Sequence, residues 1–341
     1  MDTKNTPPKQ PSYLAQIRQL RTLAKEAVKQ YSLTARHMEF IKYGTNGIFR
    51  ITDSQQKQYA LRIPDSHHEP SAILEEIGWM NHILETTDVT VPKPIKTLSG
   101  QYIVEASHPT VSSSRCCLLF EWLPGKKKWK SINENYANHL GEIIAKLHRS
   151  GLHFPMNHRN YWLADGLIGV ETAKLYNIEK LPTISAQEQQ QLTSARRMVY
   201  TILKDQEQKY PNKTGVIHSD TQPNNILVHE GRFSMIDFDD CGIGFYNDDL
   251  AVALCAFEHI AEGNPSKSFP LLKEALLNGY SKHMPLSEED LRLLPYFMLT
   301  RKLVTIAWIE AHNINPRAHH YFPIAIARAI QFYEKIRSST C

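Results

Sequence analysis

The chain has 341 residues, and its 39 basic and 35 acidic side chains leave a formal net charge of only +4. So small an excess does not indicate a nucleic-acid-binding protein. No run approaches the ~18 apolar residues of a membrane span, and the chain begins without the apolar stretch of a signal peptide. We therefore expect a cytoplasmic protein that binds neither nucleic acid nor a membrane, and the length predicts about two domains.

The first third of the chain is predicted to mix helices and strands. Residues 1–12 contain three prolines and are expected to form a lead without regular structure. Apolar residues at helical spacing predict a helix over 12–31, with Ser12 as its N-cap. Strand signals follow over 38–120, interrupted by a helical run over 72–84. This part is therefore expected to be an α+β domain.

The remainder, after Pro124 and Gly125, is predicted to be mostly helical. Three short apolar runs, at 214–217, 226–228 and 233–236, are instead typical of strands. Polar residues directly follow the first and the third of these runs. We therefore expect those polar side chains to meet at the ends of adjacent short strands.

The polar residues beside these runs are His218 and Asp220 after the first run, Asn225 before the second and Asp237 after the third. Phosphoryl transfer passes through a charge-spread transition state, so a protein contributes mainly positioning and electrostatic stabilisation. One carboxylate must accept a hydroxyl proton, and other oxygen ligands must hold Mg²⁺ against the nucleotide phosphates. We predict that Asp220 is the base and that Asn225 and Asp237 are the magnesium ligands. Two unrelated aspartate-rich turns are the alternative.

The order H-x-D-x-x-x-x-N, followed by a hydrophobic residue and D-F-D, resembles the aminoglycoside phosphotransferase and choline kinase superfamily. Residues 15–335 are covered in family order. Five further segments resemble parts of the family. Residues 59–63 resemble its phosphate-contacting strand, 76–80 the start of its paired helix and 119–125 its hinge. Residues 140–148 resemble the helix after the hinge, and 159–169 resemble a segment of its bacterial members.

The resemblance implies an α+β, bilobal, protein-kinase-like fold that uses ATP and Mg²⁺. It divides the chain into a lead and helix (1–35), a small nucleotide-binding lobe with an antiparallel sheet that ends in the hinge (36–123), and a larger, mostly helical lobe with the catalytic motifs and a substrate groove (124–341). The sequence carries no signal for oligomeric state.

Arg62 occupies the position where kinases usually have a lysine that contacts the α- and β-phosphates. A guanidinium can also bind phosphate and carboxylate oxygens through paired donors, so the resemblance implies that Arg62 contacts the nucleotide with Glu76 as its partner. The alternative is an exposed strand arginine balanced by solvent.

Two other segments of the small lobe are implied to contact the nucleotide. Gly44 and Asn46 lie in the loop that would cover the phosphates, although an N-G pair also predicts a plain hairpin turn. Backbone groups near Glu121 and Leu123 would meet the adenine edge.

Three residues are implied to support the catalytic loops. His218 would hydrogen-bond within the catalytic turn without taking the proton. Asp239 would lie beside the metal as an indirect ligand, and Asp249 would brace the loop from the following helix. A simple helix N-terminal charge is the alternative for Asp249.

The acceptor is expected to be a hydroxyl group of a small molecule. Protein kinases of the eukaryotic type need a long activation segment, whereas only nine residues separate Asp239 from Asp249. A bacterial Ser/Thr protein kinase that resembles the stress response kinases and a nucleotide-binding regulatory pseudokinase remain alternatives. The candidate substrate residues are Arg159, Trp162, Arg301, Trp308, Glu310 and His312, with helix core as the alternative for Trp308.

Overall fold

The computed structural model describes residues 12–64, 69–169, 181, 184–264, 266–311 and 316–340. The chain divides into two compact units, one of Met1–Asn81 with Val91–Leu123 and one of His82–Thr90 with Pro124–Cys341. Residues 1–11 of the expected lead lie outside the described residues. Among the helices of the described part, none is both long enough and apolar enough to span a bilayer.

The first unit is an antiparallel sheet with a helix packed on it. The sheet has the order β1-β2-β3-β6-β4, and β5 pairs with β6. The elements are α1 (Tyr13–Val28), β1 (Ala35–Tyr43), β2 (Gly47–Asp53), β3 (Gln58–Ile63), α2 (Pro70–Thr86), β4 (Pro94–Ile95), β5 (Ile103–Ala106) and β6 (Arg115–Glu121). Helix α2 begins in this unit and ends in the second.

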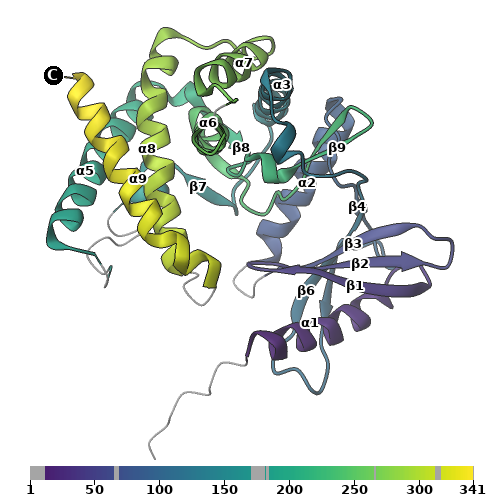
Figure 1. Ribbon diagram of the computed structural model, residues 1–341. Helices are drawn as coiled ribbons and strands as arrows, with labels where there is room; N and C mark the ends of the chain where they lie inside the picture. Colours follow the sequence, from purple (N-terminus) through teal and green to yellow (C-terminus); the bar gives the residue numbers. More distant parts are fainter. Residues whose placement is uncertain are drawn as a thin grey trace, which may run out of the picture. The chain divides into compact units, whose positions relative to one another are not determined.

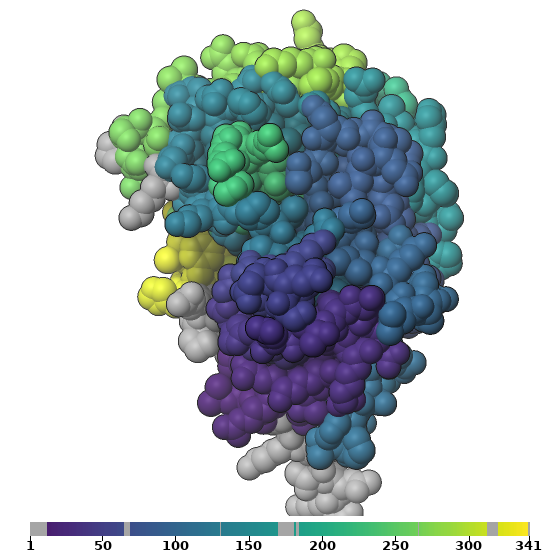
Figure 2. Space-filling model, turned by 90° about the vertical axis from the view of Figure 1, so that its right-hand side faces the viewer, coloured from purple at the N-terminus to yellow at the C-terminus, as the bar shows by residue number. Residues whose placement is uncertain are grey.

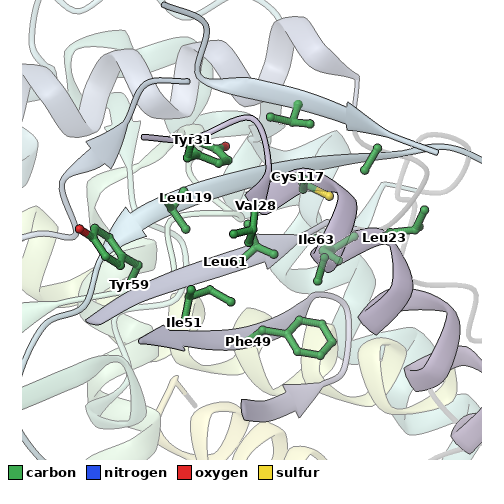
Figure 3. Packing of buried hydrophobic residues seen from close by; sticks show 14 of the residues in the cluster. Leu23, Val28, Tyr31, Phe49, Ile51, Tyr59, Leu61, Ile63, Cys117 and Leu119 are labelled. Atoms are coloured by element: carbon green, nitrogen blue, oxygen red, sulfur yellow. The ribbon is translucent and has the colours of Figure 1, made fainter. Parts of the chain in front are cut away.

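Helix α1 forms because its apolar residues recur at helical spacing and its start is capped. The Ser12 hydroxyl accepts a hydrogen bond from the Ala15 amide at 3.3 Å, which confirms the predicted N-cap. Strand β2 alternates buried and half-buried side chains, so one face of the sheet is apolar. Figure 3 shows that face with Leu23 and Val28 of α1 against Phe49 and Leu61 of the strands.

The second unit is mostly helical (Figure 1). Its helices are α3 (Glu134–Gly151), α4 (Ala164–Ile168), α5 (Ala186–Lys209), α6 (Tyr246–Glu262), α7 (Phe269–Ser281), α8 (Glu288–Ala311) and α9 (Pro316–Thr340). Its strands are β7 (Asn160–Trp162), β8 (Thr214–Ile217), β9 (Ile226–His229), β10 (Arg232–Met235) and β11 (Gly242–Phe245). The three predicted short strands correspond to β8, β9 and β10, and the α+β class is confirmed.

Short backbone distances fix the packing of this unit. A Cβ atom on Gly141 of α3 would lie 2.1 Å from the carbonyl oxygen of Leu276 in α7, and one on Gly279 would lie 2.0 Å from that of Asn138. Only glycine permits this approach of the two helices.

The strands form two small sheets that place the functional loops. Strand β11 pairs with β7 in parallel and with β8 in antiparallel orientation, while β9 and β10 form a hairpin. Figure 2 shows this hairpin as a green patch at the surface, beside α3. The Phe233 ring holds it there, with centroids 5.1 Å from the rings of Tyr136 and His139. The loops after β8 and β10 are thereby anchored at both ends.

Candidate active site

The loop after β8 and the loop after β10 lie against each other. The Ile236 amide donates to the Asn225 carbonyl oxygen at 2.9 Å. The His218 ring bonds the carbonyl oxygen of Ile236 through Nε2 at 3.2 Å, while its Nδ1 accepts from the Asp220 amide at 3.3 Å. Because a carbonyl can only accept, the ring proton lies on Nε2. Both ring nitrogens of His218 are thus used to join the two loops.

The Asp220 carboxylate is held by donors from three directions. Asn225 Nδ2 donates to Oδ2 at 2.6 Å, Arg301 Nη2 donates to Oδ1 at 2.9 Å, and Gln222 Nε2 lies 2.9 Å from Oδ2. The side chain is 17% exposed, so a small hydroxyl compound can reach it. A fixed, accessible carboxylate has the geometry of a general base. Gln222 was not identified from the sequence, because a lone glutamine in a loop carries no chemical signature.

Asp249, in the first turn of α6, braces the loop that carries Asp220. Its Oδ2 accepts from the His218 amide at 2.9 Å and its Oδ1 from the Ser219 amide at 2.7 Å. Ser219 has a φ of 65°, a conformation that costs on the order of 1–3 kcal/mol and persists only where surrounding contacts hold it. These contacts favour the bracing role over a simple helix N-terminal charge.

His148 of α3 completes this support and was not predicted. Its Nε2 lies 2.9 Å from Asp249 Oδ2, and its Nδ1 lies 2.8 Å from the Tyr280 hydroxyl. The ring is fully buried. A histidine at the end of an apolar helical run gives no sequence signal that separates this role from ordinary core packing.

Asn225 and Asp237 fit a magnesium ion that is shared with phosphates. Asn225 Nδ2 also donates to the Asp220 carbonyl oxygen at 2.9 Å. The hydrogen bonds of this nitrogen fix the orientation of the side-chain amide. Asp237 has a φ of 73°, unusual for a residue other than glycine and typical of functional turns. The described residues contain no group of three or more His, Cys, Asp or Glu side chains placed to bind a metal. Mg²⁺ is usually bound by one or two protein oxygens together with substrate phosphates and water, so a closed protein cage is not needed.

Arg159 and Trp162 were expected to contact the substrate, but both side chains bind the backbone of a loop instead. Arg159 Nε donates to the Cys241 carbonyl oxygen at 2.8 Å, and its Nη2 donates to that of Asp239. Trp162 Nε1 donates to the Asp240 carbonyl oxygen at 2.6 Å. Both side chains are buried, and both hold the backbone of the loop that carries Asp237 and Asp239.

The other acceptor candidates are distributed along α8 and beyond it. Arg301 touches Asp220 and so belongs to the site. Glu310 lies nine residues further, about 14 Å along the helix at ~1.5 Å per residue, and burial raises the pKa of its carboxyl group. Trp308 is 42% exposed and is therefore not helix core. His312 lies outside the described residues.

In the first unit, Arg62 and Glu76 form a buried ion pair. Arg62 Nη1 and Nη2 donate to the two Glu76 oxygens at 2.6 and 2.8 Å, and the guanidinium carbon lies 5.2 Å from the centre of the Phe120 ring. Arg62 is 6% and Glu76 1% exposed, so the alternative of an exposed strand arginine is wrong. The fork uses two of the five N–H groups of the guanidinium.

The other residues that were expected to contact the nucleotide lie in a turn and at the end of the sheet of the first unit. Gly44 and Asn46 lie in the turn between β1 and β2, where the Gly44 amide donates to the Asn46 carbonyl oxygen at 3.3 Å. Such a turn forms with or without a bound phosphate, so both interpretations of this segment stay open. The Glu121 amide donates to the Lys93 carbonyl oxygen at 2.9 Å, so this N–H is engaged within the sheet. Leu123 is the last residue of the unit.

Nothing in the sequence indicated that Asp248, beside Asp249, is a buried carboxyl group. It is 1% exposed, and neither carboxylate oxygen has a hydrogen-bond partner among the described residues. Burial raises its pKa to about 7, although the nearby Arg301 charge lowers it. The ionised form is therefore disfavoured in the folded protein.

We expect Asp248→Asn to stabilise the protein at pH 8 and to have little effect at pH 4. An acid whose folded pKa lies above its unfolded value near 3.9 binds its proton more tightly when folded, so stability falls as pH rises between these two values. The shift to about 7 corresponds to as much as ~4 kcal/mol at pH 8. Thermal unfolding of both proteins between pH 4 and 8 measures this difference.

Asp205→Asn is the control, because Asp205 forms an exposed pair with Lys209 on α5. Its stability difference from the wild type should not grow with pH in this manner. A stabilisation by Asp248→Asn that is the same at pH 5 and pH 8 would contradict the expected titration.

Comparison with known proteins identifies the family. Residues 41–289 match the phosphotransferase enzyme family, and the chain belongs to this family. It is 26% identical over 279 residues to a homoserine kinase of Nitrobacter hamburgensis, with 76% of each chain covered. The protein is accordingly a kinase that phosphorylates a hydroxyl group.

Solved structures confirm the expected fold. A microcompartment-associated aminopropanol kinase has a TM-score of 0.81 at 24% identity, covering 94% of this chain and 98% of that one. A choline/ethanolamine kinase family protein from Mesorhizobium loti has a TM-score of 0.63 at 18% identity, covering 92% and 94%. The family match and these structures together confirm the predicted superfamily and its bilobal protein-kinase-like fold.

Proposed function

We propose that the protein transfers the γ-phosphate of ATP to a hydroxyl group of a small molecule, with Asp220 as the proton acceptor. The observation that carries this proposal is the Asp220 carboxylate itself, which three side chains orient while it stays accessible. A catalytic base must be fixed within hydrogen-bond reach of the hydroxyl whose proton it takes.

In the proposed reaction, the acceptor oxygen bonds to the γ-phosphorus as the bond from this phosphorus to the departing ADP oxygen breaks. Asp220 takes the hydroxyl proton, and Arg301 and Asn225 keep its carboxylate oriented. Asn225 and Asp237 would hold Mg²⁺, which neutralises phosphate charge when bound. Asp239 would support that ion indirectly.

The first unit would supply the remaining nucleotide contacts. Arg62, oriented by Glu76, would contact the α- and β-phosphates. The turn with Gly44 and Asn46 would lie over the phosphates, and the backbone at Leu123 would contact the adenine.

A small acceptor is favoured over a protein acceptor by the short connection between the metal loop and α6. The residues between Asp239 and Asp249 include β11, which is paired on both sides, and the first turn of α6. This connection is fixed in a sheet and a helix, which leaves no segment of the activation-loop kind. The names of the relatives, homoserine kinase and aminopropanol kinase, support a small acceptor that carries an amino group.

The test is phosphoryl transfer from ATP with Mg²⁺ to a panel of amino alcohols, hydroxy amino acids, aminoglycosides, sugars and generic protein substrates. Phosphorus NMR identifies the product, and ADP release gives the rate. Transfer to a small hydroxyl compound supports the proposal. Transfer to protein substrates alone would favour a protein kinase, and nucleotide binding without any transfer would favour a pseudokinase.

ATP is expected to bind much more weakly without Mg²⁺ than with it. Asn225 and Asp237 are proposed to act on the phosphates through the metal, and in its absence Asp237 would repel them. Calorimetric titration with ATP in Mg²⁺ or in EDTA measures the difference. Asp165→Asn, a change in an exposed pair with Lys204, should leave it unaltered. Equal affinity under both conditions would contradict the assigned metal ligands.

A further inference from the structure

Residues 125–129, at the start of the second unit, lie against strand β9, which directly follows the turn Pro223–Asn225. The Lys126 amide donates to the Val228 carbonyl oxygen at 3.2 Å, and the Val228 amide donates to that of Lys126 at 3.0 Å. These two hydrogen bonds add residues 125–129 to the hairpin of β9 and β10 (Figure 2), on the side of β9 that does not pair with β10. The backbone that follows Asn225 is thereby fixed three residues further along.

The close approach of these two backbones requires glycine at position 125. Gly125 has a φ of 128°, which other residues rarely adopt, and a Cβ atom there would lie 3.1 Å from the carbonyl carbon and oxygen of Val228. A side chain would strain the backbone and press the segment away from β9. The contact is therefore specified by the sequence of the segment.

The Trp129 side chain fixes the turn from its other end. Its Nε1 donates to Oδ1 of Asn224, the residue directly before Asn225. An indole N–H can only donate, so the amide oxygen of Asn224 is the acceptor. The lysines at 126–128 are exposed, whereas the indole is half-buried. Asn225 thus lies between two fixed points, Asn224 before it and Val228 after it.

The position of Asn225 matters because Mg²⁺ tolerates little displacement of its ligands. This ion needs nearly octahedral coordination by oxygens at about 2.0–2.1 Å, whereas Ca²⁺ accepts flexible geometry at about 2.3–2.6 Å. Asn225 Nδ2 donates to the Asp220 carbonyl oxygen and to Oδ2, which leaves Oδ1 of Asn225 as the atom that can bind a metal. A displaced turn would therefore weaken the binding of Mg²⁺ before that of Ca²⁺.

We propose that Trp129 is a positioning residue of the magnesium site, which acts through Asn224 to hold Asn225 where Mg²⁺ requires its oxygen. The indole would act on the metal only through the turn. This inference rests on the proposed phosphotransferase function, with Asn225 as a metal ligand, and adds to it a residue outside the catalytic loops.

The test measures the affinity for ATP by calorimetric titration in Mg²⁺, in Ca²⁺ and in EDTA, for the wild type and for Trp129→Phe. Phenylalanine keeps an aromatic ring but lacks the N–H donor. In Mg²⁺ the Kd should rise by about 2- to 10-fold, which corresponds to the net ~0.5–1.5 kcal/mol of one hydrogen bond. In Ca²⁺ the rise should be smaller, and in EDTA the Kd should not change.

Asn224→Ala removes the acceptor of the same hydrogen bond and should cause the same loss in Mg²⁺. The double variant Trp129→Phe/Asn224→Ala should lose no more than either single variant, because both changes break one bond. Melting temperatures show which variants are folded. If one single variant is not folded, the other one carries the comparison between the metals.

Tyr200→Phe is the matched control, because it also removes one donor from an aromatic side chain. The Tyr200 hydroxyl donates to Asp165 Oδ1 at 2.6 Å, between α5 and α4. The affinities of this variant for ATP should equal those of the wild type under all three conditions.

The outcomes separate this inference from the function on which it rests. An equal loss in Mg²⁺ and Ca²⁺, or losses that add in the double variant, would overturn the role of Trp129. An unchanged Kd in Trp129→Phe, where the wild type transfers phosphate and needs Mg²⁺ to bind ATP, would overturn it as well and leave the proposed function standing. A wild type that binds ATP equally well in Mg²⁺ and in EDTA would overturn the assigned metal ligands and this inference with them.

Discussion

Asp220→Asn is expected to lower turnover by about 10²- to 10⁴-fold, the usual contribution of a general base. Asparagine keeps the size of the side chain and can still bond Arg301 through its oxygen, but it cannot accept the hydroxyl proton. Binding of ATP with Mg²⁺ should stay near the wild-type affinity, because Asp220 is assigned to the acceptor and not to the nucleotide. Single-turnover rates and calorimetric titration measure the two quantities separately.

Asp165→Asn is again the suitable control, since Asp165 lies in an exposed network with Tyr200 and Lys204. It should turn over at the wild-type rate. If Asp220→Asn turns over as fast as this control on an established acceptor, Asp220 is not the base and the proposed mechanism fails.

The local chemistry of the catalytic loops could be predicted because the residues that carry it lie close together in the sequence. Asp220, Asn225 and Asp237 stand next to short apolar runs, and such runs form strands whose ends hold the next residues in place. Glu76 could be predicted as the partner of Arg62 because it stands in the following helix at the position where the resembled family has the glutamate of this pair. The hairpin at Gly44 was left with two interpretations, since an N-G turn forms with or without a ligand.

The roles of Arg159 and Trp162 could not be predicted, because they depend on contacts between distant parts of the chain. Parallel pairing places residues 160–162 beside 242–244, some 80 positions later, and this pairing turns both side chains onto the loop after β10. Hydrophobic periodicity reports which face of an element is buried but not which element covers it.

The same limit applies to ion pairs between distant helices. Glu258 and Lys302 look like ordinary surface charges of two helices in the sequence, and only the packing of α6 against α8 brings them to 2.5 Å. His148 is another case, since its partner Asp249 follows 101 residues later. Contacts between residues far apart in the sequence therefore decide both the support of the catalytic loops and the charged pairs between helices.

Arg62 should show a graded loss of activity on substitution. Arg62→Met removes the charge and the donors, and we expect kcat/KM to fall by roughly 10- to 150-fold if one charge-assisted hydrogen bond in the transition state is lost. Arg62→Lys keeps the charge without the planar pair of donors and should retain more activity. Glu76→Gln should resemble Arg62→Lys, because it removes only the carboxylate that orients the guanidinium.

Stability must be separated from phosphate binding in this series, because the pair is buried. Arg62→Met leaves the Glu76 carboxylate buried without its partner, which typically destabilises a protein by about 3–5 kcal/mol. The double variant Arg62→Met/Glu76→Gln removes that charge, so we expect it to recover much of the melting temperature while its activity stays low. Arg50→Met, which breaks a half-exposed pair with Glu39 on the same sheet, should change both quantities little.

This double variant decides what Arg62 does. If its activity recovers together with its melting temperature, the ion pair only stabilises the first unit and the phosphate contact must come from another residue. If the melting temperature recovers and activity does not, the positive charge at position 62 acts on the nucleotide. In that case the affinity for ATP with Mg²⁺ should be lower in the double variant and in Arg62→Met than in Arg62→Lys, because lysine alone retains a positive charge beside the phosphates.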